Sequence, residues 1–187
     1  MMQQLCKLIL KTAGWSWSVS VPDYSKSVIC IAPHTSNWDF IIGKLFYTAV
    51  GRNANFLIKK EWFFFPFNYF FAAVGGIPVD RTQKGSLVEH LVQVCREKER
   101  FNIGITPEGT RKRNPHWKKG FYYIAYKAEV PIVLACFDYQ HKCLMMDKVI
   151  VPTGDEENDM KEIKRYFRQN AGPKYPELFV TGLEEEK

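Results

Sequence analysis

A histidine and an aspartate lie five positions apart just after a short apolar run, in the stretch PHTSNWDF at residues 33–40. The run VICIA, residues 28–32, is typical of a buried strand, and apolar residues at helical spacing predict a helix over residues 37–50. His34 and Asp39 would point about 140° apart if both were in the middle of that helix. Their side chains can meet if His34 precedes the helix and Asp39 lies in its first or second turn, with Ser36 or Asn37 as the N-cap.

Such a pair would suit general base chemistry. An aspartate bonded to one ring nitrogen of His34 would fix the tautomer of the imidazole, leave the other nitrogen basic and stabilise the imidazolium that forms. The nucleophile would then be a hydroxyl group of the substrate. A simpler interpretation is that His34 makes a local hydrogen bond and that Asp39 is only a charge at the start of a helix. The spacing alone does not separate the two.

A second cluster ends another predicted strand. The stretch GGIPVDR, residues 75–81, finishes with Arg81. The planar guanidinium of an arginine suits a phosphate group. A surface ion pair between Arg81 and Asp80 is an equally simple interpretation.

A third cluster is the stretch ITPEGTRKR, residues 105–113. Gly109 would allow a ligand to approach the backbone closely. Thr110 and Arg111 supply donors for a phosphate, and Glu108 could anchor an arginine. The stretch lacks the GK[ST] ending of a nucleotide-binding loop. It is therefore either a phosphate site of another kind or an ordinary basic turn.

Apolar runs alternate with amphipathic segments along the chain. The runs predict strands at residues 28–32, 56–58, 76–79, 101–105, 131–137 and 149–151. The amphipathic segments predict helices at residues 37–50, 86–98, 118–127 and 156–170, the second with a capping box formed by Ser86 and Glu89. This alternation predicts an α/β fold, a single domain over residues 1–187 with a central, largely parallel mixed sheet flanked by helices. The three clusters would then share the carboxyl edge of the sheet, where ligands gather in such folds.

The composition favours an anionic partner. The 187 residues carry a net charge of +6, which suits a phosphorylated metabolite, an anionic lipid or a nucleic acid. No nucleic-acid-binding motif is present, so nucleic acid is not an expected partner. The five cysteines are odd in number and form no CxxC pair, which indicates a reducing compartment, the cytosol.

One segment is rich in aromatic residues. The stretch EWFFFPFNYFF, residues 61–71, has eight aromatic side chains in eleven positions. It could form an apolar surface for an acyl chain, a wedge in a membrane interface or an aromatic helix in the core. No segment approaches the roughly 20 consecutive apolar residues of a spanning helix. We therefore expect peripheral attachment to a membrane rather than a span.

The stretches HTSNWD at 34–39, GGIPVDR at 75–81, ITPEGTR at 105–111 and VPIVLA at 130–135, taken in this order, resemble the sequence blocks of one family. This is the glycerolipid acyltransferase family, the phospholipid and glycerol acyltransferases that include 1-acylglycerol-3-phosphate acyltransferase. The resemblance covers about residues 28–137. It leaves an N-terminal segment, residues 1–27, and the predicted C-terminal helix, residues 156–170, outside it. Thr106 replaces the usual Phe and Leu134 replaces a common second Pro, and both departures concern the fit of the substrate.

The resemblance implies an enzyme of phospholipid biosynthesis. It would move a fatty acyl group from acyl-CoA or acyl-carrier protein to the hydroxyl of a lyso-glycerolipid, with 1-acylglycerol-3-phosphate as the expected acceptor. No metal and no cofactor beyond the acyl thioester co-substrate is implied. The expected location is cytoplasmic, with peripheral attachment to a membrane surface.

The resemblance also implies roles by position. His34 would be the general base and Asp39 its orienting partner. The phosphate of the acceptor would be bound by five residues of the two basic clusters, Arg81, Glu108, Gly109, Thr110 and Arg111. Lys60 would donate to the oxyanion of the tetrahedral intermediate.

Three alternatives remain open at this point. The acceptor could be another lyso-lipid, such as an aminolipid. A metal-dependent phosphoesterase would use the acidic and histidine side chains as ligands, namely His34, Asp39, Asp80, Glu108 and His116. A non-catalytic protein that binds lipid or membrane would leave the histidine and aspartate unused.

Overall fold

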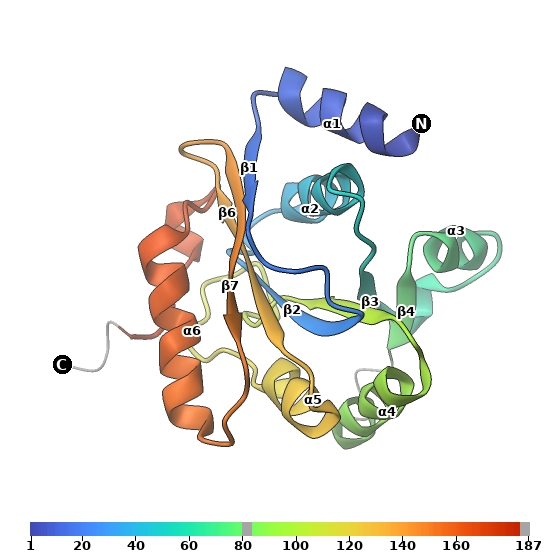
Figure 1. Ribbon diagram of the computed structural model, residues 1–187, viewed down its shortest axis with the longest axis vertical. Coiled ribbons are helices and arrows are strands. Elements are labelled where there is room, and N and C mark those ends of the chain that lie inside the picture. The colour runs from blue at the N-terminus through green and yellow to red at the C-terminus, as the bar shows by residue number, and fades with distance from the viewer. Residues whose placement is uncertain (80–83, 184–187) are drawn as a thin grey trace.

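The computed structural model describes residues 1–79 and 84–183, and their centre is one seven-stranded sheet (Figure 1). The strand order is β1-β7-β6-β2-β5-β3-β4. Between described strands every pairing is parallel except that of β6 with β7. The strands are β1 (Ser16–Val19), β2 (Lys26–Ala32), β3 (Asn55–Lys59), β4 (Gly76–Val79), β5 (Phe101–Ile105), β6 (Ile132–Asp138) and β7 (Cys143–Ile150). The predicted α/β fold with a largely parallel mixed sheet is confirmed.

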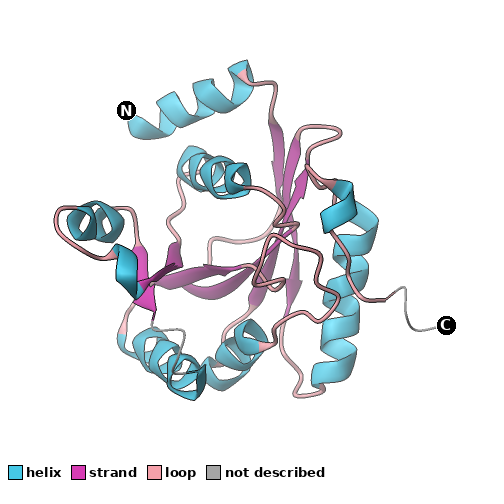
Figure 2. Ribbon diagram, turned by 180° about the vertical axis from the view of Figure 1, so that it is seen from behind, coloured by secondary structure: helices cyan, strands magenta, loops and turns pink. Residues whose placement is uncertain are grey.

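Helices cover both faces of the sheet (Figures 1 and 2). Helices α1 and α2 lie on one face, and α4, α5 and α6 lie on the other. Helix α3 lies beyond the edge strand β4. The α-helices are α1 (Met2–Thr12), α2 (Asn37–Ala49), α3 (Phe67–Ala73), α4 (Lys84–Glu97), α5 (Gly120–Ala128) and α6 (Glu156–Asn170), with short 3-10 helices η1 (Lys60–Trp62) and η2 (Pro176–Leu178).

Strand β2 carries the candidate histidine at its end and is buried on both faces. Val28 and Cys30 pack into the core beneath α4, α5 and α6, whereas Ile29 packs into the core beneath α1 and α2. Successive side chains of a strand point to opposite faces, so the sequence of a strand that is covered on both sides is a continuous run of apolar residues. This burial explains the run at residues 28–32 and fixes the position of the residues that follow it.

Several predicted boundaries are wrong, for local reasons. Helix α4 begins at Lys84, so Ser86 lies inside the helix and the predicted capping box with Glu89 is not its N-terminus. Strand β7, Cys143–Ile150, begins earlier than the predicted 149–151, because the charged residues Asp147 and Lys148 interrupt its apolar sequence without ending the strand. The sequence does not predict α1 or β1. Helix α1 is amphipathic, with Cys6 and Leu10 buried four positions apart on one face, and the prediction did not include it.

The aromatic segment, residues 61–71, is not a core helix. None of the residues of η1 or α3 is buried. Phe65 is 78% exposed, and Trp62, Tyr69 and Phe70 are exposed as well. This exposure rules out the core-helix interpretation, and we call residues 61–71 the aromatic projection. No described helix is both long and apolar enough to cross a membrane.

Candidate active site

The turn after β2 places the histidine outside helix α2 and the aspartate within its first turn. Ser36 is the N-cap, and its hydroxyl accepts a hydrogen bond of 3.2 Å from the backbone N of Trp38. The carboxylate of Asp39 in turn accepts from the backbone N of Ser36, which completes a capping box. The helix therefore begins at Asn37, as the geometry of the pair requires, and the expected N-cap is confirmed.

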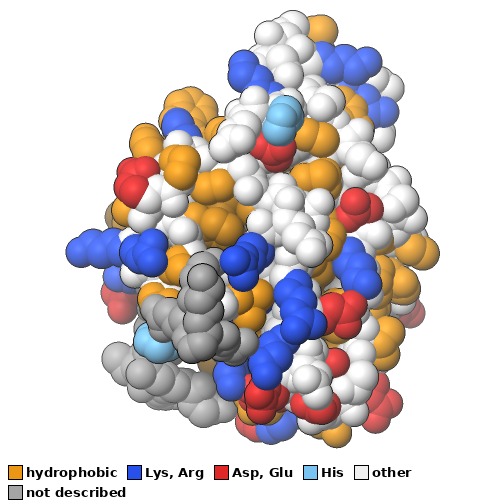
Figure 3. Space-filling view, turned by 90° about the vertical axis from the view of Figure 1, so that its left-hand side faces the viewer, with side chains coloured by type: hydrophobic (Ala, Val, Ile, Leu, Met, Phe, Trp, Pro, Cys, Tyr) orange, Lys and Arg blue, Asp and Glu red, His pale blue; other side chains and the backbone are white. Residues whose placement is uncertain are grey.

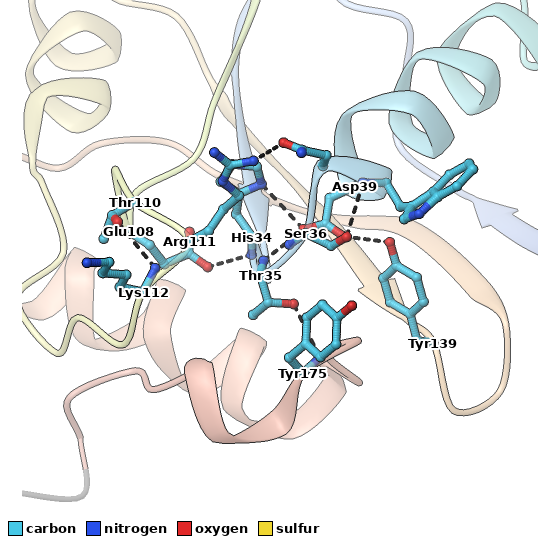
Figure 4. Close-up of polar contacts among 12 residues, drawn as sticks. His34, Thr35, Ser36, Asp39, Glu108, Thr110, Arg111, Lys112, Tyr139 and Tyr175 are labelled. Atoms are coloured by element: carbon cyan, nitrogen blue, oxygen red, sulfur yellow. Dashed lines mark hydrogen bonds and ion pairs between the residues drawn. The ribbon is translucent and has the colours of Figure 1, made fainter.

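His34 and Asp39 face each other across this turn (Figure 4). Nδ1 of His34 lies 3.4 Å from Oδ2 of Asp39. The same oxygen accepts hydrogen bonds of 2.8 Å from the backbone N of Thr35 and from that of Ser36. Asp39 is buried, whereas the side chain of His34 is 23% exposed. The carboxylate is thus held in place by the backbone, and the ring remains open to a substrate.

Glu108 joins the third cluster to the first. Strands β2 and β5 are parallel neighbours, with Cys30 opposite Ile105, so both strands end at the same edge of the sheet. Oε1 of Glu108 accepts a hydrogen bond of 2.8 Å from the backbone N of His34. The expected anchoring of an arginine by Glu108 is therefore not seen in the described residues, since the carboxylate holds the backbone of His34 instead.

The carboxyl group of Glu108 is buried and only half satisfied. Oε2 is buried and has no hydrogen-bond partner among the described residues. Burial raises the pKa of Glu108 to about 7, although hydrogen bonds from the backbone of Glu108 and of His34 and the charge of His34 act in the opposite direction. This carboxyl group therefore exchanges its proton near neutral pH.

The turn after Glu108 brings Arg111 to the start of α2. Gly109 has a φ of +63°, and a Cβ at this position would come within 2.7 Å of the Lys118 side chain. The hydroxyl of Thr110 accepts from the backbone N of Lys112 at 3.2 Å. The guanidinium of Arg111 donates to Oδ1 of Asn37. A glycine is required here because other residues seldom adopt this conformation.

An open hollow of about 580 Å³ lies between the start of α2 and this turn. Its walls come from three segments and consist of Thr35, Ser36, Asn37, Trp38, Thr110, Arg111, Lys112, Tyr175 and Leu178. The volume is within the usual range for small-molecule sites. The cationic side chains of Arg111 and Lys112 give it the character of a site for an anionic group.

The contacts among described residues do not join Lys60 to this group. Lys60 is exposed at the end of β3, which β5 separates from β2. Its side chain forms no hydrogen bond or ion pair with any described residue, and its predicted role rests on the resemblance alone. Arg81 lies outside the described residues.

A sequence model of a family described as Acyltransferase matches residues 18–137. The chain belongs to the glycerolipid acyltransferase family. An uncharacterized acyltransferase of Schizosaccharomyces pombe is 28% identical over 126 residues, which make up 62% of this chain and 44% of that protein. A 1-acyl-sn-glycerol-3-phosphate acyltransferase of Cocos nucifera is 31% identical over 83 residues, which make up 41% of this chain and 27% of that protein. The chain thus spans less than half the length of the curated relatives that it matches.

The fold of this chain is also similar to a solved structure. The crystal structure of the 1-acyl-sn-glycerophosphate (LPA) acyltransferase PlsC from Thermotoga maritima matches with a TM-score of 0.60. The match covers 90% of this chain and 78% of that chain, at 15% sequence identity. At this identity the likeness shows a shared fold.

Several residues of the candidate site were not predicted from sequence. The hydroxyl of Tyr139, in the β6–β7 turn, donates to Oδ1 of Asp39. The backbone N of Tyr175 donates to Oγ1 of Thr35 at 3.4 Å. The ammonium group of Lys174 lies 5.5 Å from the centre of the Trp38 ring. Separations of 100 and 140 positions along the chain leave no local signal for the first two contacts, which only the fold creates.

The described residues give no support to the two kinds of chemistry that would replace a general base. Within residues 1–79 and 84–183, no three His, Cys, Asp or Glu side chains come together as metal ligands, and Asp80 of the phosphoesterase alternative lies outside these ranges. Burial raises the pKa of the Cys30 thiol and that of the Cys136 thiol. These two thiols therefore stay protonated and are poor nucleophiles.

Proposed function

We propose that the chain transfers a fatty acyl group from an acyl thioester to the hydroxyl of a lyso-glycerolipid. The observation that carries the proposal is the contact of 3.4 Å between His34 and Asp39 beside the turn of Glu108 to Arg111. A family of acyltransferases implies a lipid acceptor and an acyl donor. We propose 1-acylglycerol-3-phosphate as the acceptor, because two of the matched proteins carry that activity in their names. The donor is acyl-CoA or acyl-carrier protein.

The proposed reaction needs one base and no acyl-enzyme. His34 removes the proton from the acceptor hydroxyl while the oxygen attacks the thioester carbonyl, so a C–O bond forms and the carbonyl oxygen becomes an oxyanion. Asp39 stabilises the imidazolium of His34. When the tetrahedral intermediate collapses, the C–S bond breaks and His34 returns the proton to the leaving thiolate.

The hollow beside His34 is the proposed site for the acceptor phosphate. Arg111 and Lys112 line it, and the resemblance adds Arg81, Glu108, Gly109 and Thr110. A phosphate in this hollow would replace Asn37 as the partner of the Arg111 guanidinium, since charged acceptors form the stronger hydrogen bonds. The proposed contact of Lys60 with the oxyanion remains a prediction.

Peripheral attachment to a membrane is part of the proposal. Rings of the aromatic projection contact one another, with Phe64 and Phe67 centred 5.2 Å apart. Its helix α3 lies beyond the edge strand β4 (Figure 1). Lys59 and Lys60 are exposed at the base of the projection. On the side of α6, away from α3, basic and hydrophobic side chains also lie beside one another (Figure 3). Aromatic side chains next to lysines suit the interface of an anionic bilayer.

Thiol release from palmitoyl-CoA, with and without lysophosphatidic acid, tests the proposed function. The assay is repeated with palmitoyl-acyl-carrier protein, with other lyso-lipids including an aminolipid, and with EDTA. Release that depends on a phosphorylated acceptor and survives EDTA supports the proposal. Release only with an unphosphorylated acceptor would contradict the proposed phosphate site. No release with any acceptor on vesicles would contradict the transferase assignment.

A further inference from the structure

The hairpin between β6 and β7 contributes a side chain to the candidate active site. Tyr139 follows β6 directly, and its hydroxyl donates to Oδ1 of Asp39 (Figure 4). Tyr139 lies two positions beyond the region that the family model matches, residues 18–137. Membership of the family therefore assigns it no role, and the inference rests on the contacts of this chain.

The two carboxylate oxygens of Asp39 have different partners. Oδ2 accepts from the backbone N of Thr35 and of Ser36 and lies 3.4 Å from Nδ1 of His34. Oδ1 accepts from Tyr139, its partner among the described residues. Rotation of the carboxylate would break one set of contacts or the other. The tyrosine thus fixes the plane of the group that faces the histidine.

Tyr139 is itself held in place. Its backbone N donates to the carbonyl oxygen of Gly172 at 2.7 Å. Its ring packs edge to face with that of Trp15, with the centres 5.1 Å apart. Burial, followed by the hydrogen bond to Asp39, raises the pKa of Tyr139 well above its usual range, so the hydroxyl keeps its proton and can only donate to the carboxylate.

We propose that Tyr139 is a positioning residue for the acyl transfer, which acts on His34 through Asp39. This inference rests on the proposed role of His34 as the base. The hydroxyl of Tyr139 neither touches the substrate nor exchanges a proton. It restrains the Asp39 carboxylate and takes up part of its charge, and both effects tune the basicity and orientation of the imidazole.

Tyr139→Phe removes the hydroxyl and keeps the ring that packs on Trp15. Tyr166→Phe is a matched control, because the hydroxyl of Tyr166 donates to a carboxylate oxygen of Asp147 and burial raises its pKa in the same way. In the transfer assay we expect kcat to fall about tenfold in Tyr139→Phe, with both KM values within about twofold of wild type. Tyr166→Phe should keep kcat within about twofold.

A histidine titration followed by NMR tests the coupling without any enzymatic activity. The His34 signal is identified by its loss in His34→Gln. Its titration midpoint should move upward in Tyr139→Phe and equal that of wild type in Tyr166→Phe. Without the hydrogen bond from Tyr139, the negative charge of Asp39 stabilises the protonated ring of His34 more strongly. The second carboxyl group near the ring, that of Glu108, is the same in all these proteins.

Each outcome has a defined meaning. An unmoved or lowered midpoint in Tyr139→Phe would overturn the inference, and so would a kcat equal to that of Tyr166→Phe in an active enzyme. A wild-type protein without transferase activity would count against the proposed function, while a raised midpoint would still support the link from Tyr139 to His34.

Discussion

The backbone N of His34 donates a hydrogen bond of 2.8 Å to Oε1 of Glu108, and this contact joins the ends of β2 and β5. The carboxyl group that makes it is buried, and its second oxygen has no partner among described residues. A buried carboxyl group with one unsatisfied oxygen favours its neutral form. The stability of the site therefore depends on pH.

Stability should decline as pH rises through the titration of Glu108. The pKa of Glu108 is raised from 4.5 to about 7 on folding. The folded protein thus holds this proton more tightly than the unfolded chain. Its contribution to the free energy of unfolding is complete below about pH 4.5 and is lost as the pH rises through about 7, a change of about 3 kcal/mol.

Glu108→Gln should remove this part of the pH dependence. Urea unfolding at about pH 5 and about pH 8 measures it, with the exposed Glu99→Gln as the control. We expect the difference between the two pH values to shrink by about 3 kcal/mol in Glu108→Gln and to be unchanged in Glu99→Gln. An equal decline in both variants would show that Glu108 is not the group responsible.

Gly109→Ala should destabilise the turn that carries Arg111. The φ of +63° disfavours alanine, and the new Cβ would meet the Lys118 side chain at 2.7 Å. The lysine is flexible and can move, so the strain of the backbone dominates, and we expect a loss of about 1 kcal/mol. Gly120→Ala is the control, because its Cβ would meet Val88 at 4.0 Å. Urea unfolding compares the two, and equal stability would contradict the strained turn.

Arg111→Ala should weaken the binding of the acceptor more than the binding of the donor. Loss of a guanidinium that binds the acceptor phosphate should raise the KM of lysophosphatidic acid about tenfold and that of palmitoyl-CoA less than about twofold. Arg113→Ala is the control, because Arg113 is exposed in the same turn and does not line the hollow. Equal increases of the two KM values in Arg111→Ala would contradict the proposal that the acceptor phosphate binds at this site.

Substitutions in the aromatic projection should separate membrane binding from stability. Phe65→Ser and Phe70→Ser remove exposed side chains, so the free energy of unfolding should change by less than about 1 kcal/mol. Binding to vesicles that contain anionic lipid should fall about tenfold for the pair, since apolar area leaves the interface. Val151→Ser, at a residue 71% exposed outside the projection, is the control. Unchanged vesicle sedimentation for the Phe variants would contradict the proposed surface.

The sequence predicted the parts of the fold that neighbouring residues determine, such as the starts of helices. Helix α6 has Asp155 as its N-cap and acidic residues in its first turn, and its predicted bounds match the structure. The contact of His34 with Asp39 follows from a helix start that Ser36 defines. Helix α1 is also amphipathic, since its buried residues Cys6 and Leu10 lie on one face, but the prediction did not include it.

The remaining site residues depend on long-range packing. Tyr139 reaches Asp39 because β6 lies beside β2 in the sheet and both strands end at the same edge, which no spacing in the sequence records. Glu108 was predicted as a site residue, but its contact with the backbone of His34 was not, because that contact follows from the register of β2 and β5.

The most direct measurement is the rate of acyl transfer in His34→Ala, compared with His141→Ala. His141 also forms a pair with an aspartate, since its Nδ1 lies 2.5 Å from Oδ2 of Asp138, but it is largely exposed in the β6–β7 turn. If His34 is the base, thiol release that depends on lysophosphatidic acid should fall at least about a hundredfold in His34→Ala and stay within about twofold of wild type in His141→Ala. Full activity in a folded His34→Ala protein would contradict the account.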